Sequence, residues 1–402
     1  MRRVGIWAVG LCLLMGCRRA ETPPAECVDS EQAPIAAPRS HLEPAHGSRH
    51  APLPVCDARD GDPLFAARTH FDAGDYLAAL SCASQAVALD LHDADAHAER
   101  GAALSALERF DEAKLAYARL FALDPDHVDG LLGAAHLYGV LLPGSRGNDH
   151  LAALYAERGM RLPPADSDTR ARFALVSAIA HNDLGQPHRA LERAEEALRL
   201  MPDHPEGLHE RALAHFERSA FEAAARDFLR LLEDPVAAAS AHHHLGLILE
   251  RQPGASQQAA AYLERARTLA PAHFRHPVDV SPEAFQAAVD RILTALPDDM
   301  RADLEGIPIE VEEQPSEEDL LGDEPPLSPM ILGLYRGPPL GVACPAEATD
   351  RPCRSIALYR RNLQRAASER EDLEKQIEVT LLHEVGHLRG EDDHELEARG
   401  LD

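Results

Sequence analysis

Between about Asp60 and His273, small and large apolar residues recur with helical spacing in units of similar length. One alanine marks the same phase in each unit, and successive alanines lie 34, 39, 38, 34 and 35 residues apart. These positions are Ala79, Ala113, Ala152, Ala190, Ala224 and Ala259. A period of this length is typical of a solenoid built from repeated supersecondary units. The pattern therefore predicts about six pairs of helices, with the extra residues in loops.

The clearest unit, Asp95 to Pro125, reads DAHAERGAALSALERFDEAKLAYARLFALDP. Gly101 and Ala113 are small where two antiparallel helices would cross, and Tyr117 is large enough to fill a gap. The close-crossing position is small in all units and reads Ala67, Gly101, Ala135, Ala178, Ala212 and Gly246. Alanine richness alone would not keep these columns in phase. The region resembles tetratricopeptide repeats, and this resemblance implies a groove that binds peptides or protein partners.

Downstream of the repeats the pattern changes to shorter elements of both kinds. Ser281 and Pro282 are typical of a helix start, and apolar residues follow at helical spacing. The segments IPIEVEE, MILGLYRG and SIALYRRNL predict short strands, and EDLEKQIEVTLLHEVGHL predicts a long helix that runs into Gly390. We therefore expect a mainly α protein, in which an α-solenoid over residues 60–273 precedes a small α+β domain over residues 279–402.

Composition narrows the possible functions. With 402 residues and 45% apolar content, the chain can bury more than one core. Its formal charge of -27 argues against a nucleic-acid partner, because phosphate binding needs a basic surface and the sequence shows none.

The first residues have the pattern of an export signal. Arg2 and Arg3 precede an apolar stretch from Val4 to Met15, and residues 14–17 read LMGC. This segment resembles the signal peptide and lipobox of bacterial lipoproteins, which implies acylation of Cys17 and a lipid anchor to the membrane. The protein would then lie in the bacterial cell envelope, facing the periplasm or the exterior. An ordinary secretory signal or a helix of an inner core is the alternative.

After this expected signal peptide of residues 1–17, residues 18–59 are rich in Pro, Ala, Glu and Ser and lack any apolar period. This composition predicts a disordered tether. In an exported chain, Cys344 and Cys353, which bracket CPAEATDRPC, are candidates for a disulfide. Cys82 falls at a helical position, where we expect a small buried hydrophobic residue.

A run of three histidines, 242–244, falls in the first helix of the sixth unit. Adjacent helical residues point about 100° apart, so three in a row do not converge on one metal ion. We interpret this run as structural.

Candidate chemistry is concentrated in the stretch LLHEVGHLRGEDD, which contains H-E-x-x-H-x-x-G-x-x-D, where x is any residue. His383 and His387 are four residues apart, so they share a helix face and can present two imidazole nitrogens to one zinc ion. Glu384 is then close enough to act on a zinc-bound water. Gly390 can take the left-handed conformation that ends the helix, which would let Asp393 supply the third ligand. The fourth position stays open, as in catalytic zinc sites.

Together with the segments TALPDDM, LGLYRGPPL and IALYRRN, this motif resembles the small bacterial zincin-like metallopeptidase family over residues 280–402. The resemblance implies that His383 and His387 bind the metal, that Asp393 is the third ligand and that Glu384 is the catalytic glutamate. The hypothesis is a lipid-anchored, zinc-dependent endopeptidase whose repeats recruit a protein substrate or partner.

Two alternatives remain. The chain could be a tetratricopeptide scaffold lipoprotein of the cell envelope, whose C-terminal domain binds metal without proteolysis. The motif could also lie on an ordinary amphipathic helix without metal. For the peptidase, His394, Tyr335 and Tyr359 are candidates to stabilise the oxyanion, and the sequence does not choose among them.

Overall fold

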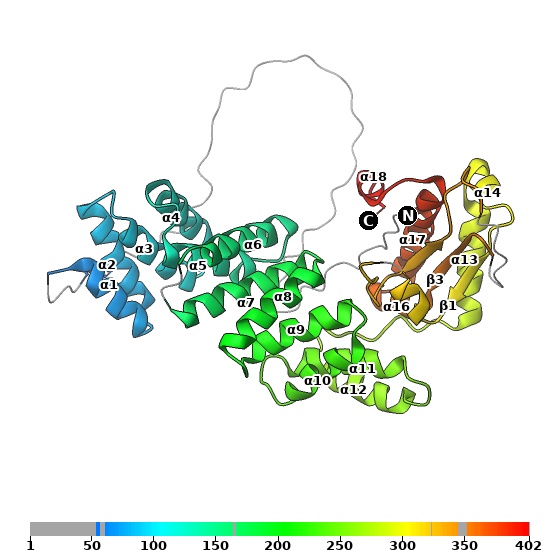
Figure 1. Cartoon of the computed structure of the whole chain (residues 1–402), viewed down its shortest axis with the longest axis horizontal. Helices are drawn as coiled ribbons and strands as arrows, with labels where there is room; N and C mark the ends of the chain where they lie inside the picture. The colour runs from blue at the N-terminus through cyan, green and yellow to red at the C-terminus, as the bar shows by residue number, and fades with distance from the viewer. Residues whose placement is uncertain (1–53, 57–60, 164–165, 323, 345–351, 402) are drawn as a thin grey trace, which may run out of the picture. The chain divides into compact units, whose positions relative to one another are not determined.

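The computed structural model describes residues 54–56, 61–163, 166–322, 324–344 and 352–401 (Figure 1). The expected signal peptide, Cys17 and nearly all of the expected tether lie outside these residues. The described chain forms two compact units, which divide after Asn148. Within the described residues, no helix is both long and apolar enough to cross a membrane.

The first unit consists of helix pairs. Its helices are α1 (Pro63–Asp72), α2 (Tyr76–Leu89), α3 (Ala94–Ala106), α4 (Phe110–Leu123) and α5 (Val128–His136), followed by the π-helix η1 (Leu137–Leu141). Side chains of Asp62, Asp75 and Asp93 accept backbone N–H bonds and cap α1, α2 and α3. Gly101 shows why the crossing position is small, since a Cβ there would lie 2.8 Å from the Tyr117 ring.

The helix pairs continue in the second unit. The helices are α6 (Arg146–Arg161, which begins just before the division), α7 (Ser167–Asp183), α8 (Pro187–Leu200), α9 (Pro205–Glu217), α10 (Phe221–Arg230), α11 (Ala238–Glu250) and α12 (Ser256–Leu269). Neighbours in sequence pack on each other, most extensively α7 on α8 and α11 on α12. Phe216 and Phe228 are buried at the centre of the last two pairs. This arrangement is a tetratricopeptide-like solenoid.

A small α+β domain completes the second unit. Its elements are α13 (Pro282–Ala295), α14 (Asp298–Asp303), β1 (Ile309–Glu312), α15 (Glu317–Leu321), β2 (Gly333–Arg336), β3 (Ser355–Tyr359), α16 (Arg360–Ala366), α17 (Arg370–Arg389) and α18 (Asp393–Glu397). The sheet has the order β1-β3-β2, with β1 parallel and β2 antiparallel to β3. The predicted fold class, an α-solenoid followed by a small α+β domain, is thus confirmed.

Successive side chains of β3 point to opposite faces of the sheet and divide the core of this domain into two layers. Ile356 and Leu358 face a cluster with Phe285 of α13 and Leu381 of α17. Ala357 and Tyr359 point to the opposite face, where they pack with residues that include Leu320, Leu327 and Ile331. The sheet is therefore covered on both sides, and β2 lies at its edge beside α17.

The cysteines differ from expectation at one position. Cys82 is fully buried in α2, as its helical position suggested, but it forms a disulfide with Cys56. The interpretation of Cys82 as a plain hydrophobic residue was therefore wrong. Burial suits a thiol and a disulfide alike, and a separation of 26 residues across the start of α1 carries no local signal of pairing. Cys344 and Cys353 also form a disulfide.

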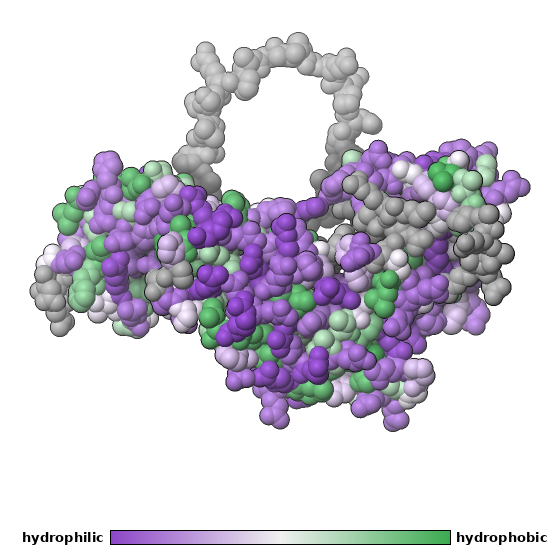
Figure 2. Space-filling model, viewed as in Figure 1, coloured by the Kyte–Doolittle hydropathy of each residue, from purple (hydrophilic) through white to green (hydrophobic). Residues whose placement is uncertain are grey.

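The three consecutive histidines of α11 have separate neighbours. His243 stacks on Phe274 and His244 stacks on Phe228, whereas His242 lies against Tyr262. These ring contacts fit the interpretation of the run as structural. The surface seen in Figure 2 is mostly hydrophilic, in keeping with the large net charge.

Candidate metal centre

Helix α17 carries the motif residues on a well-anchored scaffold. Its buried apolar side chains include Ile377, Leu381 and Val385, which belong to the core shared with α13 and the sheet. Gly390 ends the helix with φ 93° and ψ 12°, the left-handed conformation predicted for it. The chain then reverses and enters α18 after Asp392, whose side chain caps that helix.

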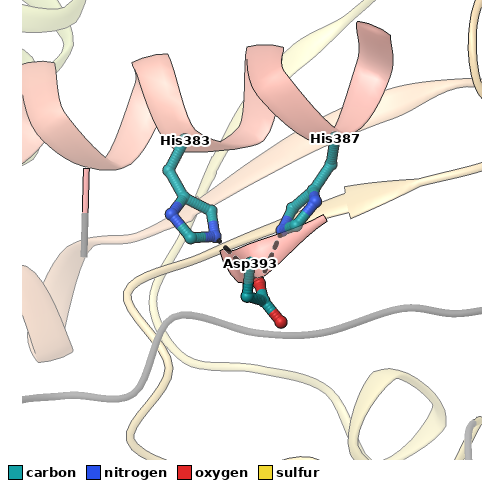
Figure 3. Close-up of side chains that lie close together, drawn as sticks. All are labelled: His383, His387 and Asp393. Atoms are coloured by element: carbon teal, nitrogen blue, oxygen red, sulfur yellow. Dashed lines mark ion pairs between the residues drawn. The ribbon is translucent and has the colours of Figure 1, made fainter. Parts of the chain in front are cut away.

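This reversal places Asp393 opposite the two histidines (Figure 3). His383 Nε2 lies 3.5 Å from Asp393 Oδ1, and His387 Nε2 lies 3.3 Å from the same oxygen. One ligand atom from each of the three residues lies within 4.8 Å of the other two. Among the residues that the structure describes, this is the one group with such a geometry.

Four atoms of the motif are buried and lack hydrogen-bond partners. They are the three ligand atoms that face one another, His383 Nε2, His387 Nε2 and Asp393 Oδ1, and also Glu384 Oε1, which is on the same helix as the histidines. Each unpaired buried polar atom costs about 1–3 kcal/mol, so four together point to a ligand that satisfies them. Imidazole nitrogens with a carboxylate oxygen form a donor set that suits a divalent transition metal such as zinc.

Backbone carbonyls hold the outer nitrogens of both histidines. His383 Nδ1–H donates to the Leu401 carbonyl at 2.5 Å, and His387 Nδ1–H donates to the Glu391 carbonyl at 3.0 Å. A proton on Nδ1 leaves Nε2 with its lone pair, which is the form that binds a metal. The chain on both sides of α18 thus orients both rings.

Glu384 is only 1% exposed, and its two oxygens differ in surroundings. Oε2 accepts the Tyr335 backbone N–H of β2 at 2.6 Å, whereas Oε1 has no partner. Burial raises the pKa of Glu384, and the two histidines and the Tyr335 N–H offset part of that rise. The carboxyl group is therefore fixed in place and holds a proton more readily than an exposed glutamate.

Glycine at position 333 lets β2 approach this carboxylate. A Cβ there would lie 2.6 Å from Thr380 Cγ2 and 2.9 Å from Glu384 Oε1. Any larger residue would push the strand away from α17 or displace Glu384.

Burial raises and the histidines lower the pKa of Asp393, with a lowered pKa as the result. For His387, burial lowers the pKa, but Asp393 and Glu384 outweigh burial and raise it. The pKa values of Asp393 and His387 are therefore shifted in opposite directions, and the nearness of each residue to the other contributes to both shifts.

The residues considered for oxyanion stabilisation lie differently. The Tyr359 hydroxyl is buried and donates to Asp319 at 3.4 Å, and the Tyr335 hydroxyl donates to the Pro338 carbonyl at 2.5 Å. Both phenols are engaged elsewhere. His394 has an exposed side chain at 88% of its full area.

Sequence reasoning missed the backbone groups of Tyr335, Glu391 and Leu401. A carbonyl or N–H is present at every position, so no residue type marks these three.

Residues 304–401 match the family model described as zincin-like metallopeptidase. A search of curated proteins finds no match.

Among solved structures, the repeat protein YrrB, described as having an unusual peptide-binding site, is 19% identical, covering 48% of this chain and 93% of its own, with a TM-score of 0.39. PilW, a type IV pilus biogenesis factor, is 17% identical over 58% of this chain and 99% of its own, with a TM-score of 0.44. PilF of Pseudomonas aeruginosa is 16% identical over 56% of this chain and 95% of its own, also with a TM-score of 0.44. With the geometry above, the family match identifies residues 304–401 as a zincin-like metallopeptidase domain, which follows an array of tetratricopeptide-like repeats.

Proposed function

We propose that the C-terminal domain is a zinc-dependent peptidase, in which His383, His387 and Asp393 hold the metal and Glu384 acts as general base. The observation that carries this proposal is the convergence of three buried ligand atoms without hydrogen-bond partners, with a fourth such atom, Glu384 Oε1, on the helix that carries both histidines. The family match supports a metal and a peptidase.

Zinc bound here would polarise a substrate carbonyl and lower the pKa of a water molecule at the open position. Glu384 supplies the proton transfers. Its Oε2 is fixed by the Tyr335 N–H, so Oε1 has a defined position from which to take a proton and pass it to the leaving amine. The raised pKa of the buried carboxyl group makes it a stronger base than an exposed glutamate.

We further propose that the helix pairs recruit a protein or peptide, which fits their repeated architecture. The lipobox-like segment supports acylation of Cys17 and attachment to a membrane of the cell envelope, with the domain facing the periplasm or the exterior.

The test uses the chain from Arg18 onward, so that both disulfides are kept, and compares wild type with Glu384→Gln. We expect one zinc ion per chain in both proteins, and a loss of peptide cleavage by about 10²–10⁴-fold in Glu384→Gln. The substitution keeps the size of the side chain, so its effect reports the carboxylate.

Asp393→Ala, with Glu397→Ala on the same helix as control, tests the ligand set. We expect zinc affinity to fall by at least about 100-fold only in Asp393→Ala. Bound zinc without any cleavage that depends on Glu384 would instead favour the scaffold alternative, in which the domain binds metal without proteolysis.

A further inference from the structure

The last two repeats contact the metallopeptidase domain, which belongs to the same compact unit. We call Glu217, Ser219, Phe221, Glu250 and Arg251 the docking face. They lie at the end of α9, at the start of α10 and at the end of α11. Glu217, Ser219 and Phe221 lie against residues 327–331, LSPMI, which we call the strap. Glu250 lies against α16, and Arg251 lies against Pro315.

Apolar side chains from the strap and from the docking face each pack into the core of the opposite side. Met330 packs against the core of the last two repeats, and Phe221 packs against the cluster that contains Leu327 and Ile331. The Ser219 hydroxyl donates to the Leu327 carbonyl at 3.4 Å. Ser328 hydrogen-bonds the Glu217 carboxylate, whose pKa is raised by burial. The repeats therefore bind the strap by its side chains and by its backbone.

Charged groups extend the contact from the repeats to α16 and to Pro315. Glu250 ends α11, where the helix dipole disfavours a carboxylate, and it pairs with Arg365 and, at 3.6 Å, with Arg361. The side chains of Glu250 and Arg365 are only 13% and 14% exposed, so either charge would be costly without the other. Arg251 donates to the Pro315 carbonyl at 2.6 Å and lies 4.9 Å from the centre of the Phe221 ring.

The strap leads directly to the metal centre. On its inner side, Asn362 Nδ2 donates to the carbonyls of Pro329 at 2.9 Å and Ile331 at 2.8 Å. The strand β2 begins two residues after Ile331, and its Tyr335 N–H holds Glu384. The strap, which the repeats contact, is thus continuous with β2, the strand that positions the candidate general base Glu384.

We propose that the last two repeats hold β2 against α17 through the strap, so that Glu250 and Arg365 are positioning residues for Glu384. In this role the repeats are a part of the metal centre's framework, in addition to any recruitment of a partner. The docking face is covered by the chain's own strap, by α16 and by Pro315, so recruitment falls to other surfaces of the repeats. The catalytic meaning of this proposal rests on the proposed peptidase function, whereas its structural part does not.

The experiment uses the metal-free chain from Arg18 onward and measures amide hydrogen exchange in β2, with peptide cleavage as a second readout. The variants are Glu250→Arg, Arg365→Glu and the double exchange of both charges. A milder variant, Glu250→Gln, serves if the reversals fail to fold. Arg230→Glu is the control, because it breaks an exposed ion pair with Asp203 inside the repeats.

We expect each single reversal to speed exchange at Tyr335 by about tenfold or more, because an unpaired buried charge loosens the contact. The double variant should restore slow exchange, and the control should not change it. Exchange in the core of α17, at Ile377 and Leu381, should change less than exchange in β2. In cleavage, the single reversals should lower kcat more than they change KM, since they act on the base.

Unchanged exchange at Tyr335 in both reversals, or equal acceleration throughout α17 and β2, would overturn the proposal. A wild-type chain that cleaves no peptide would contradict the peptidase function alone, because the exchange data still decide the role of the strap.

Discussion

At the scale of single residues, the metal centre depends on how closely a strand can approach a helix. Glu384 is oriented by a backbone N–H of β2, and that bond requires the strand to pass close to α17. Gly333 permits this approach, because a side chain at that position would clash with Thr380 and Glu384.

We therefore expect Gly333→Ala to displace Glu384 or β2. Overpacking of this kind costs about 1–3 kcal/mol of unfolding free energy. Cleavage should fall sharply, while zinc affinity should change little, since the three ligands come from α17 and α18. Thermal denaturation, a peptide cleavage assay and zinc titration measure these three outcomes.

Gly147→Ala is the matched control, because a Cβ at that helical glycine meets no atom within 4 Å. It should leave stability unchanged or raise it slightly, as alanine favours a helix. Equal behaviour of the two variants would contradict the packing argument.

The sequence was informative about this site only where the functional group belongs to a side chain and not to the backbone. Two histidines four residues apart, a glutamate and a glycine at the helix end have a spacing that a metal and a helix geometry require, so His383, His387, Glu384 and Asp393 could be proposed without a structure. The partners of the two histidines are the carbonyls of Leu401 and Glu391, and the partner of Glu384 is the N–H of Tyr335. Their position follows from how the chain folds back, which no local pattern encodes.

At the scale of elements, α18 and the residues after it form a hook over α17. Leu401 is nearly buried, its N–H donates to the Leu396 carbonyl, and its own carbonyl accepts from His383. The hook thus orients His383, a proposed metal ligand, from outside the helix.

A chain that ends at Arg399 should therefore bind zinc about 10–100-fold more weakly, the usual effect of losing a group that orients a ligand. Leu401→Ala is the control, because it keeps the carbonyl and removes only the side chain. Competition with a chelator measures both affinities. If Leu401→Ala weakens binding as much as the truncation, packing of the side chain matters and the carbonyl does not.

A buried histidine in the repeats makes their stability depend on pH. Burial lowers the pKa of His244 to about 4, with the neighbouring His209 adding to the effect and a bond to the Ser240 carbonyl opposing it. The unfolded chain, with a pKa near 6.5, binds the proton first. Stability is therefore fully present above pH 6.5 and is lost as the pH falls toward 4.

From that shift we expect the repeats around α11 to lose about 2 kcal/mol between pH 8 and pH 5 through this one group. His244→Phe should remove that part of the pH dependence, since a phenyl ring can keep the stack on Phe228. Protection factors of amides in α10 and α11 measure it. His188→Gln, at an exposed histidine, should behave as wild type; the same pH dependence in His244→Phe would assign the loss to other groups.

The elements themselves followed well from the sequence, because helical spacing, caps and the small crossing residues are local signals. Helix starts at Asp62, Asp75 and Ser281 have a capping side chain. What failed was the interpretation of Cys82, because its partner Cys56 lies in an irregular segment before α1.

At the scale of the whole molecule, sequence patterns gave the order of the domains and missed how they join. The pair between Glu250 and Arg365 spans 115 residues, and the strap is a short proline-containing loop without a motif. Such contacts form only when two folded surfaces meet, so the sequence of neither surface alone indicates the contact. The compact unit that follows Asn148 accordingly includes the repeat helices α7 to α12 as well as the metallopeptidase domain, although the sequence suggested a division between repeats and domain.

The two disulfides should stabilise different parts of the molecule. Cys56–Cys82 closes a loop with a sequence separation of 26 residues, and a loop of this length gives about 3–4 kcal/mol through the unfolded state. It ties the segment before α1 to α2, an attachment to which Ser81 adds a bond to the Pro54 carbonyl. Cys344–Cys353, with a separation of only 9, closes a smaller loop after β2.

We therefore expect the double variant Cys56→Ser with Cys82→Ser to increase hydrogen exchange mainly in α1 and α2, and to leave zinc content at one ion per chain. Cys344→Ser with Cys353→Ser is the matched control, since it removes a disulfide but leaves the first repeat intact, and should leave exchange in α1 and α2 at the wild-type rate. Loss of zinc from the first variant would contradict this assignment, because the ligands of the metal centre and the groups that orient them all lie after Asn148. Comparing protein refolded with and without a reductant would also show whether the first repeat folds without its disulfide.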